Sequence, residues 1–398
     1  MPLHYPILMT KQKKIAIVCS YALHPNRIGG MDRFWVAYDT KAKDLGYEVD
    51  WYFVDYQPFD FFSGLTIFSA NNQNVEQFFL EKVNQENIKY DILVTHFVAL
   101  CTGFFKKAKA SGIRHIIAVD HNPRPLEGFP ISKIIKNKIK GVLYSRYIDQ
   151  FVGVSEYTRN HILKDYGSFL AKKTNIIYNG IATSVFVKRK NVTISSFDPQ
   201  SLRVPKAFRT KQSFGEIPIA IGGGEENKFI VTSHLRHSKG IQDLIKAVSI
   251  LENDIKNQIQ IDVYGEGPYE IELRRLANEF NLVTIVNFKG SSSKLNELYA
   301  SYSYLIQPSY GETFCYSIVE SLVCNVPVIT THEAGNVLSV IEENKNGFLF
   351  NAGNYNQLAA IIKNIVLGKL KIDKDVSVQI DADFNLEKMV DEHIQLLN

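Results

Sequence analysis

The chain alternates between short, mostly apolar runs and stretches in which apolar residues recur at helical spacing. Such runs predict parallel strands buried on both faces, and they lie at 14–20, 48–54, 91–95, 116–119, 150–154 and 176–178. Helical spacing predicts a helix over 33–45, after a loop that holds Gly29 and Gly30. This order of strand, glycine loop, helix and strand is typical of the opening of a doubly wound α/β domain.

The alternation breaks at about residue 188 and restarts at Lys228. Residues 188–227 carry scattered proline, serine and lysine and a run of three glycines, which predicts a linker with an insertion. Further strands are predicted at 229–232, 259–264, 284–288, 304–306 and 326–330, with helices at 240–251 and 268–280. We therefore predict two α/β domains, 1–187 and 228–383. Ligands of such sheets bind beyond the carboxyl ends of strands, so a cleft is expected at the domain junction.

Composition excludes several other classes of protein. The 398 residues are 45% hydrophobic, 12% aromatic and 22% charged. These values exclude a disordered chain, a collagen, a coiled coil and a small disulfide scaffold. The four cysteines lack CxxC spacing, which favours reduced thiols. Without a secretory signal or an uncharged apolar stretch of roughly 18 residues, the sequence predicts a cytoplasmic protein.

The net charge of +4 hides an asymmetry between the two halves of the chain. Residues 1–190 hold 26 Lys/Arg and 16 Asp/Glu, a balance of +10, whereas residues 191–398 hold 19 and 25, a balance of −6. Two bodies with different partners are therefore expected. No nucleic-acid motif accompanies the basic half, so nucleic acid is not an expected partner.

A basic stretch of the first half leaves two alternatives open. Ile131, Ile135 and Ile139 recur at four-residue spacing among lysines. They face the core beneath solvated lysines, or they form a basic amphipathic helix that contacts an anionic membrane peripherally, at its inner face.

The stretch 307–322 carries the most informative chemistry. It predicts a strand, a turn and a helix. The backbone amides that would open the helix toward an anion belong to Phe314, Cys315 and Tyr316. Glu312 lies in the turn and Glu320 about two helical turns later, so both carboxylates can accept hydrogen bonds from one sugar ligand. On spacing alone, a surface turn residue and a solvated helix residue are the alternative.

This spacing resembles the E-x7-E signature of retaining glycosyltransferases of family 4, whose GT-B architecture is two facing Rossmann-like domains. Further motifs resemble the family in the same order: Gly29-Gly30-Met31-Asp32-Arg33, Tyr178-Asn179-Gly180-Ile181, Lys239-Gly240, Gly265-Glu266-Gly267-Pro268, and Val326-Pro327-Val328-Ile329 followed by Gly335. The resemblance covers nearly the whole chain. It implies that a final helix within 384–398 packs back on the first domain.

On the second domain, the resemblance implies that Glu312 contacts the donor sugar near the reacting carbon and Glu320 the nucleotide ribose. It implies that Lys239 contacts the donor diphosphate, where the departing nucleotide needs positive charge. A solvated helix-start lysine is the alternative. The family's usual arginine is replaced by His234, and Arg236 points to the same side of an extended strand end. Arg236 or protonated His234 takes the phosphate, or His234 is structural.

On the first domain, His121 follows a strand and resembles the family's cleft histidine, which implies a contact to the donor sugar. A structural histidine is the alternative, and His96, at another strand end, ranks lower. Asp120 and Arg124 are weaker candidates for acceptor contacts.

Three further positions concern the backbone of the expected site. Gly30 lets the backbone approach a phosphate or sugar, and Gly265 belongs to a donor-side turn. Cys315 stands where the family often has glycine, and without a basic partner it is not expected to be a nucleophile.

No metal and no cofactor is expected. The two DxD sequences, 373–375 and 381–383, lie in the C-terminal tail, and the second is expected to cap the final helix. The resemblance thus implies a metal-independent, retaining hexosyltransferase. It moves a sugar from a nucleotide-sugar donor to a glycan or lipid-linked acceptor, in cell-surface polysaccharide or lipopolysaccharide synthesis. The alternatives are a nucleotide-sugar epimerase of similar fold and a non-catalytic sugar-binding protein.

Overall fold

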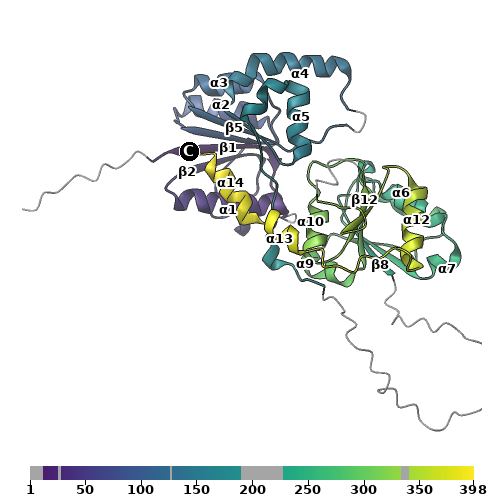
Figure 1. Cartoon of the computed structure of the whole chain (residues 1–398). Helices are drawn as coiled ribbons and strands as arrows, with labels where there is room; N and C mark the ends of the chain where they lie inside the picture. Colours follow the sequence, from purple (N-terminus) through teal and green to yellow (C-terminus); the bar gives the residue numbers. More distant parts are fainter. Residues whose placement is uncertain (1–11, 26–27, 126–127, 190–226, 333–339) are drawn as a thin grey trace, which may run out of the picture.

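Two parallel β-sheets organise the chain (Figure 1). The computed structural model describes residues 12–25, 28–125, 128–189, 227–332 and 340–398. Most of the predicted linker and insertion at 188–227, together with Gly335, lies outside the described residues.

The first sheet has the strand order β3-β2-β1-β4-β5-β6-β7, and each neighbouring pair is parallel. Its strands are β1 (Lys14–Ala22), β2 (Glu48–Asp55), β3 (Thr66–Ser69), β4 (Ile92–His96), β5 (His115–Asp120), β6 (Gln150–Gly153) and β7 (Thr174–Ile176). The helices of this half are α1 (Gly30–Asp44), α2 (Val75–Gln85), α3 (Gly103–Ala110), α4 (Ile131–Tyr144) and α5 (Glu156–Tyr166).

The second sheet has the order β10-β9-β8-β11-β12-β13 and is also parallel. Its strands are β8 (Asn227–Thr232), β9 (Ile259–Tyr264), β10 (Val286–Gly290), β11 (Tyr304–Gln307), β12 (Val328–Thr331) and β13 (Gly347–Phe350). The helices that follow β8 are α6 (Ile241–Ser249), α7 (Asn253–Lys256), α8 (Glu270–Glu279), α9 (Leu295–Leu298), α10 (Tyr316–Val323), α12 (Tyr355–Val366), α13 (Val378–Asp383) and α14 (Leu386–Gln395).

Burial on both faces explains the apolar runs. Along β1, Ile15 and Ile17 pack into one apolar cluster, whereas Ala16 and Val18 pack into another on the opposite face. Side chains alternate between the faces of a strand, so a strand between two helical layers needs an apolar residue at nearly every position. The prediction of buried parallel strands is confirmed for both halves of the chain.

Each sheet has one point at which the strand order reverses. These switch points lie between β1 and β4 in the first sheet and between β8 and β11 in the second. Loops that leave two neighbouring strands in opposite directions open a crevice there, where ligands of such sheets bind. Gly30 and His96 lie at the first switch point, and Lys239 and Glu312 follow the two strands of the second.

The end of the chain crosses back to the first sheet, as the yellow helix in Figure 1 shows. Helix α14 packs against α1, and the ring of His393 lies 4.9 Å from that of Phe34. The turn at Gly180 guides this crossing, because a Cβ there would lie 2.3 Å from the carbonyl oxygen of Asn385. Close approach of two backbones therefore requires glycine at this position.

Several details differ from the sequence-based predictions. The edge strands β3 and β13 were not predicted, and β7 ends two residues before the predicted strand. The cap of α14 is Asn385, whose side chain accepts a hydrogen bond from the amide of Lys388, so a capping role for 381–383 is wrong. Both edge strands are only four residues long. A pattern of so few residues is too short to predict a strand.

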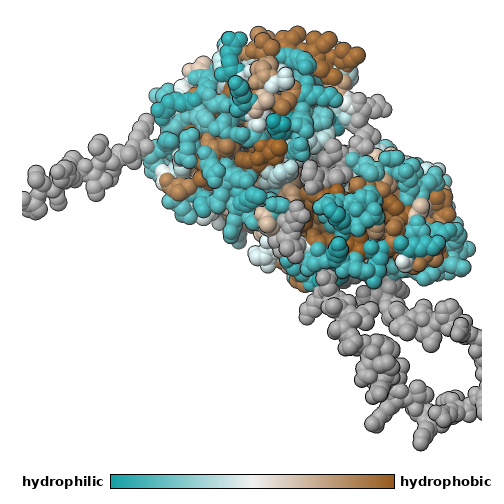
Figure 2. Space-filling view, in the orientation of Figure 1, coloured by the Kyte–Doolittle hydropathy of each residue, from teal (hydrophilic) through white to brown (hydrophobic). Residues whose placement is uncertain are grey.

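The isoleucines of α4 do not face the core. Ile131, Ile135 and Ile139 are exposed by 78%, 54% and 54%, so the core-facing alternative for this stretch is wrong. Figure 2 shows hydrophobic side chains gathered along the upper edge of the molecule, over α4. Among the described residues, no helix has both the length and the apolar character needed to cross a membrane.

Candidate active site

Lys239 and Glu312 meet at the switch point of the second sheet. The Nζ atom of Lys239 donates to Oε1 of Glu312. The hydroxyl of Ser309 also donates to this carboxylate oxygen, at 2.8 Å. Both members of the pair are mostly buried, with side-chain exposures of 23% and 15%. A cation and a carboxylate thus stand side by side at the carboxyl ends of β8 and β11.

Tight backbone contacts hold the loop that carries Lys239 against the loop that carries Glu312. Gly240 has a φ of +70°, and a Cβ at this residue would lie 1.9 Å from the carbonyl oxygen of Pro308. The amide of Tyr310 donates to the carbonyl of Ser238 at 2.9 Å. The glycine after Lys239 is therefore required by geometry, because any side chain would push the Glu312 loop away.

The turn at Gly265 packs against the same region. Its φ is +123°, and a Cβ there would lie 1.9 Å from the carbonyl oxygen of Ser233. This contact supports the segment that leads from β8 to Lys239. The side chains of His234 and Arg236 in that segment are exposed. No ion pair joins Arg236 to a carboxylate within the described part of the chain, which leaves its guanidinium available to an anion.

Helix α10 begins immediately beyond the Glu312 loop. Cys315 is its N-cap residue and provides no side-chain cap, so the first amides of the helix are left for another acceptor. Cys315 is buried, and burial raises the pKa of its thiol to about 12, so the thiol stays protonated at neutral pH. The ring of Phe314 packs edge-on against that of Tyr316 at 5.0 Å.

Glu320 faces inward from α10. The hydroxyl of Tyr299 lies 2.9 Å from its Oε2 atom and 2.7 Å from the hydroxyl of Thr232. Burial raises the pKa of Glu320, and the hydrogen bond from Tyr299 opposes this rise. No sequence pattern predicted Tyr299, which orients the Glu320 carboxylate from a separate short helix.

Three histidines cluster at the switch point of the first sheet. Nδ1 of His96 lies 2.9 Å from Nε2 of His121, and the ring of His393 lies 6.0 Å from that of His96. Burial lowers the pKa of His121 to about 3 and that of His393 to about 3, and it holds the pKa of His96 well below its usual value. All three rings are uncharged at neutral pH.

Phe97 fixes the orientation of His121. Its ring stacks on that of His121 with centroids 4.3 Å apart and an angle of 19° between the planes. Phe97 has a φ of +60°, a left-handed conformation that is costly for an aromatic residue and recurs near functional sites. The sequence predicted His96 and His121 here, whereas His393 was missed because it is supplied by the distant α14.

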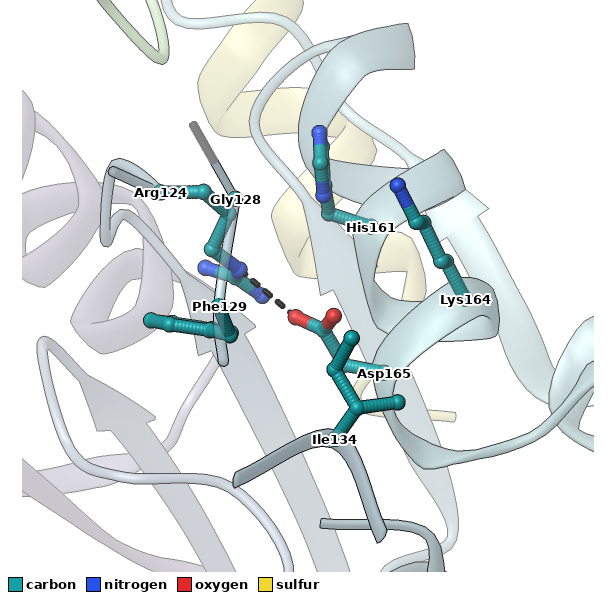
Figure 3. Close-up of a pocket in the computed structure, with 7 residues that line it drawn as sticks. All are labelled: Arg124, Gly128, Phe129, Ile134, His161, Lys164 and Asp165. Atoms are coloured by element: carbon teal, nitrogen blue, oxygen red, sulfur yellow. Dashed lines mark hydrogen bonds and ion pairs between the residues drawn. The ribbon is translucent and has the colours of Figure 1, made fainter. Parts of the chain in front are cut away.

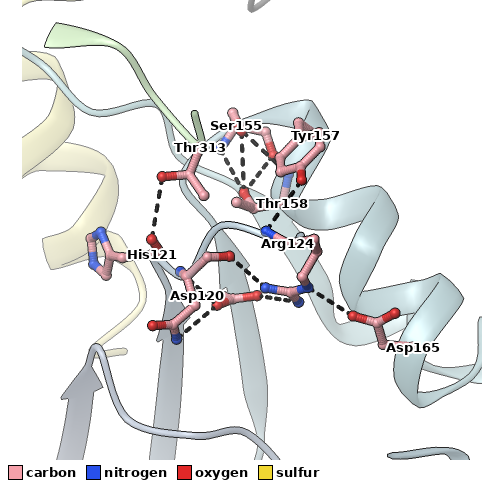
Figure 4. A network of polar contacts seen from close by, with 9 residues as sticks. Asp120, His121, Arg124, Ser155, Tyr157, Thr158, Asp165 and Thr313 are labelled. Carbon is pink, nitrogen blue, oxygen red and sulfur yellow. Dashed lines mark hydrogen bonds and ion pairs between the residues drawn. The ribbon is translucent and has the colours of Figure 1, made fainter. Parts of the chain in front are cut away.

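The two switch points touch each other. The hydroxyl of Thr313 donates to the carbonyl oxygen of His121 at 3.2 Å, as Figure 4 shows. A Cβ at Gly30 would lie 2.2 Å from Cε1 of Tyr316. The residue after Glu312 therefore contacts the strand end that carries His121, and α1 starts against the ring of Tyr316.

Asp120 and Arg124 are bound to each other instead of projecting freely (Figure 4). Arg124 donates to Asp120 and to Asp165 at 2.8 Å each, and all three side chains are at most 6% exposed. These carboxylates raise the pKa of the Arg124 guanidinium despite its burial. Asp165 on α5, which no sequence pattern predicted, completes a buried network that joins β5 to α5.

A small cavity of about 120 Å³ lies beside this network. Figure 3 shows the residues that line it: Arg124, Gly128, Phe129, Ile134, His161, Lys164 and Asp165. None of them belongs to the second half of the chain, so this cavity is separate from the Lys239–Glu312 pair. Within the described ranges, no group of three or more His, Cys, Asp or Glu side chains is arranged to hold a metal ion.

Solved structures share the fold of two parallel sheets. HepE from Anabaena, solved with UDP and glucose, is 19% identical with a TM-score of 0.71, over 97% of this chain and 99% of HepE. The apo form of the lipopolysaccharide outer core galactosyltransferase WaaB is 14% identical with a TM-score of 0.66, over 96% of this chain and 99% of WaaB. The two parallel sheets with facing switch points define the GT-B class of two Rossmann-like domains.

Sequence comparisons place the chain more narrowly. Residues 28–185 match the family model described as Glycosyltransferase Family 4, and residues 219–378 match the model of glycosyl transferases group 1. The chain belongs to this family of glycosyltransferases, as its motifs indicated.

Two curated relatives match parts of the chain. Protein CapJ of Staphylococcus aureus is 30% identical over 166 residues, which are 40% of this chain and 41% of CapJ. The poly(ribitol-phosphate) alpha-N-acetylglucosaminyltransferase of Staphylococcus aureus strain COL is 22% identical over 232 residues, 54% of this chain and 44% of that enzyme. The matches thus span less than half of the length of these relatives.

Proposed function

We propose that this glycosyltransferase moves a sugar from a nucleotide-sugar donor to a glycan or lipid-linked acceptor with retention of anomeric configuration. The observation that best supports this proposal is the contact between Lys239 and Glu312, close to the start of α10. A nucleotide sugar joins a dianionic diphosphate to a polyhydroxylated ring. Such a ligand needs a cation and a hydrogen-bond acceptor side by side.

In this proposal the donor separates the ion pair. The diphosphate forms an ion pair with the Lys239 ammonium, and the Glu312 carboxylate accepts hydrogen bonds from sugar hydroxyls. Glu320, oriented by Tyr299, binds the ribose. The amides at the start of α10 and the exposed Arg236 add positive potential around the diphosphate, so the transfer is proposed to need no metal.

The proposed reaction is a displacement at the anomeric carbon of the donor sugar. An acceptor hydroxyl attacks the anomeric carbon on the face from which the nucleotide leaves. The new C–O bond forms as the bond to the diphosphate breaks, and the departing diphosphate takes the hydroxyl proton. His121 is uncharged at neutral pH, so in this proposal it contacts the sugar as a neutral hydrogen-bonding group.

The acceptor is proposed to be a surface polysaccharide or lipopolysaccharide intermediate held mainly by the first domain. Support comes from the names of the relatives, since one acts on poly(ribitol-phosphate) and a structural neighbour on the lipopolysaccharide outer core. The acceptor site would lie on the His121 side of the junction, where Thr313 brings the two domains into contact.

Nucleotide release tests the proposal. Purified protein is incubated with a panel of UDP-, GDP- and ADP-sugars, with and without glycan acceptors, and free nucleotide is measured. We expect release from one donor to rise at least about tenfold when its acceptor is added. An epimerase would convert the donor alone, and a binding protein would release no nucleotide. The anomeric signal of the product in NMR distinguishes retention from inversion.

A further inference from the structure

Helix α4 presents five large apolar side chains to solvent. The exposed side chains, with their exposed fractions, are Ile131 (78%), Ile135 (54%), Ile139 (54%), Val142 (64%) and Leu143 (45%). Only Asn137 and Gly141 of the helix are buried. A contiguous apolar stripe of this kind on a protein surface marks an interaction site.

Packing against α5 determines where the stripe points. A Cβ at Gly141 would lie 2.0 Å from the carbonyl oxygen of Tyr166, so the two helices approach backbone to backbone. At about 100° per residue, Asn137 and Gly141 lie on one side of α4, and the five exposed apolar residues cover about 120° on the opposite side. The stripe therefore faces directly away from the domain (Figure 2).

Lysines border this stripe on both sides. At the same helical spacing, Lys138 lies next to Ile131 on one edge and Lys136 next to Leu143 on the other. The lysines of the helix are Lys133, Lys136, Lys138 and Lys140. None of the four has a carboxylate partner within the part of the chain that the structure describes. No Asp or Glu occurs in 128–148.

Neighbouring segments extend the positive charge. Helix α3 lies beside α4 and adds the exposed lysines 106 and 107. The ammonium of Lys133 lies 3.8 Å from the centre of the Phe129 ring, which anchors it at the start of the helix. An apolar stripe between rows of unpaired cations is complementary to a surface with an apolar interior and an anionic rim.

We propose that α4 binds an anionic membrane surface and lies in the plane of the bilayer. Its isoleucine stripe enters the boundary between headgroups and acyl chains, and its lysines contact lipid phosphates. A second copy of the chain fits less well, since a symmetric contact through α4 would set the same lysines against one another. The loop after His121 leads into α4, so this contact would hold the first switch point near the membrane.

Vesicle co-sedimentation tests this surface. The full chain is mixed with vesicles of 30% phosphatidylglycerol in phosphatidylcholine, or of phosphatidylcholine alone, without donor or acceptor. We expect sedimentation with the anionic vesicles and loss of at least about tenfold in affinity for the triple variant Ile131→Ser, Ile135→Ser, Ile139→Ser. Because no sugar is present, the outcome is independent of the proposed transfer reaction.

A matched control exists on the second domain. Ile250, Ile271 and Val283 are exposed by 52%, 84% and 56%, so the triple change of these residues to serine removes similar apolar surface elsewhere. This control should bind vesicles like the unaltered protein. Both triple variants should keep the unfolding temperature, since the replaced side chains are exposed.

Charge is tested separately. Replacing the four lysines of α4 by glutamine should weaken binding to anionic vesicles, and 0.5 M salt should do the same to the unaltered protein. Glutamine at the exposed lysines 345, 369, 371 and 374 is the matched control.

The proposal is overturned if the unaltered protein stays in the supernatant, or if the isoleucine variant binds as well as its control. It is equally overturned if the isoleucine variant only converts a dimer into a monomer in size-exclusion chromatography.

Discussion

The two sheets have similar topology, yet their switch points offer opposite chemistry. The first presents the uncharged rings of His96, His121 and His393, with Phe97 stacked on His121. The second presents the ion pair of Lys239 and Glu312. A site made of neutral rings and a site made of paired charges therefore face each other in one molecule.

This contrast shows that the net charge of a domain does not predict whether its switch point carries charged side chains. The half with the balance of −6 carries Lys239, whereas the half with the balance of +10 presents neutral rings at its switch point. The excess lysines of the first half lie instead on α3 and α4. In the proposed binding mode, the donor's negative charge is met by local groups that are held in place by packing, against the overall charge of their domain.

Charges near the first switch point should serve the fold and not the donor. Arg124→Met leaves Asp120 and Asp165 buried without their cation, so we expect the free energy of unfolding to fall by about 3–5 kcal/mol. Denaturant titration measures this change. Arg275→Met, which breaks exposed pairs only, should lower the free energy of unfolding far less, because solvent already screens those pairs. Equal losses for the two variants would contradict a buried, structural network.

Charges at the second switch point should serve catalysis and not the fold. Glu312→Gln keeps the size of the side chain but removes the charge that faces Lys239. We expect kcat/KM for transfer to fall about 10²–10³-fold, with an unfolding temperature close to that of the unaltered protein. Glu297→Gln, at an exposed position, is the control. A fully active Glu312→Gln would overturn the assigned site.

The contact between the two switch points can be tested at Gly30. Alanine at this position would force the ring of Tyr316 to move, so we expect transfer to fall about tenfold while both sites keep their own residues. Gly103→Ala, where a Cβ meets nothing within 4 Å, should be neutral. A double-mutant cycle with Tyr316→Ala should show that the two effects are not additive. Strict additivity would mean that the contact is unimportant.

The smallest expected effect concerns pH. The unfolded chain takes up protons on its histidines below about pH 6.5, whereas the buried rings of His121 and His393 resist protonation down to about 3. Stability should therefore fall as pH drops from 7 to 5.

One variant isolates this pH effect. His393→Phe should flatten the dependence by on the order of 1 kcal/mol, as measured by denaturant titration at several pH values. His237→Phe, at an exposed site, should leave the slope unchanged. An unchanged slope in His393→Phe would show that His393 does not contribute to the pH dependence.

Local patterns predicted much of the fold. The strand 259–264 was predicted with the bounds that β9 has, and the predicted final helix coincides closely with α14. The first prediction follows from burial, since a strand between two layers carries a continuous apolar run, whereas the final helix was implied by the family resemblance. The edge strand β3 carries no such pattern, because its residues are only partly buried.

The site was predictable only in part. Glu312, Glu320 and Lys239 were predicted because their motif positions resemble a known family. His393 had no such signal, since its role depends on where α14 ends its crossing. Asp165 and Tyr299 likewise gain their significance from partners far away in the chain.

The sequence by itself determined the two α/β units, the order of their strands along the chain and the residue types available at the strand ends. These follow from burial and from backbone chemistry, which are local. The tertiary structure decided that His393 joins His96 and His121, that Gly30 rests on Tyr316, and that the isoleucines of α4 face outward. Each of these depends on the approach of segments that are distant in the chain. A local sequence pattern contains no information about which distant segment will pack against it.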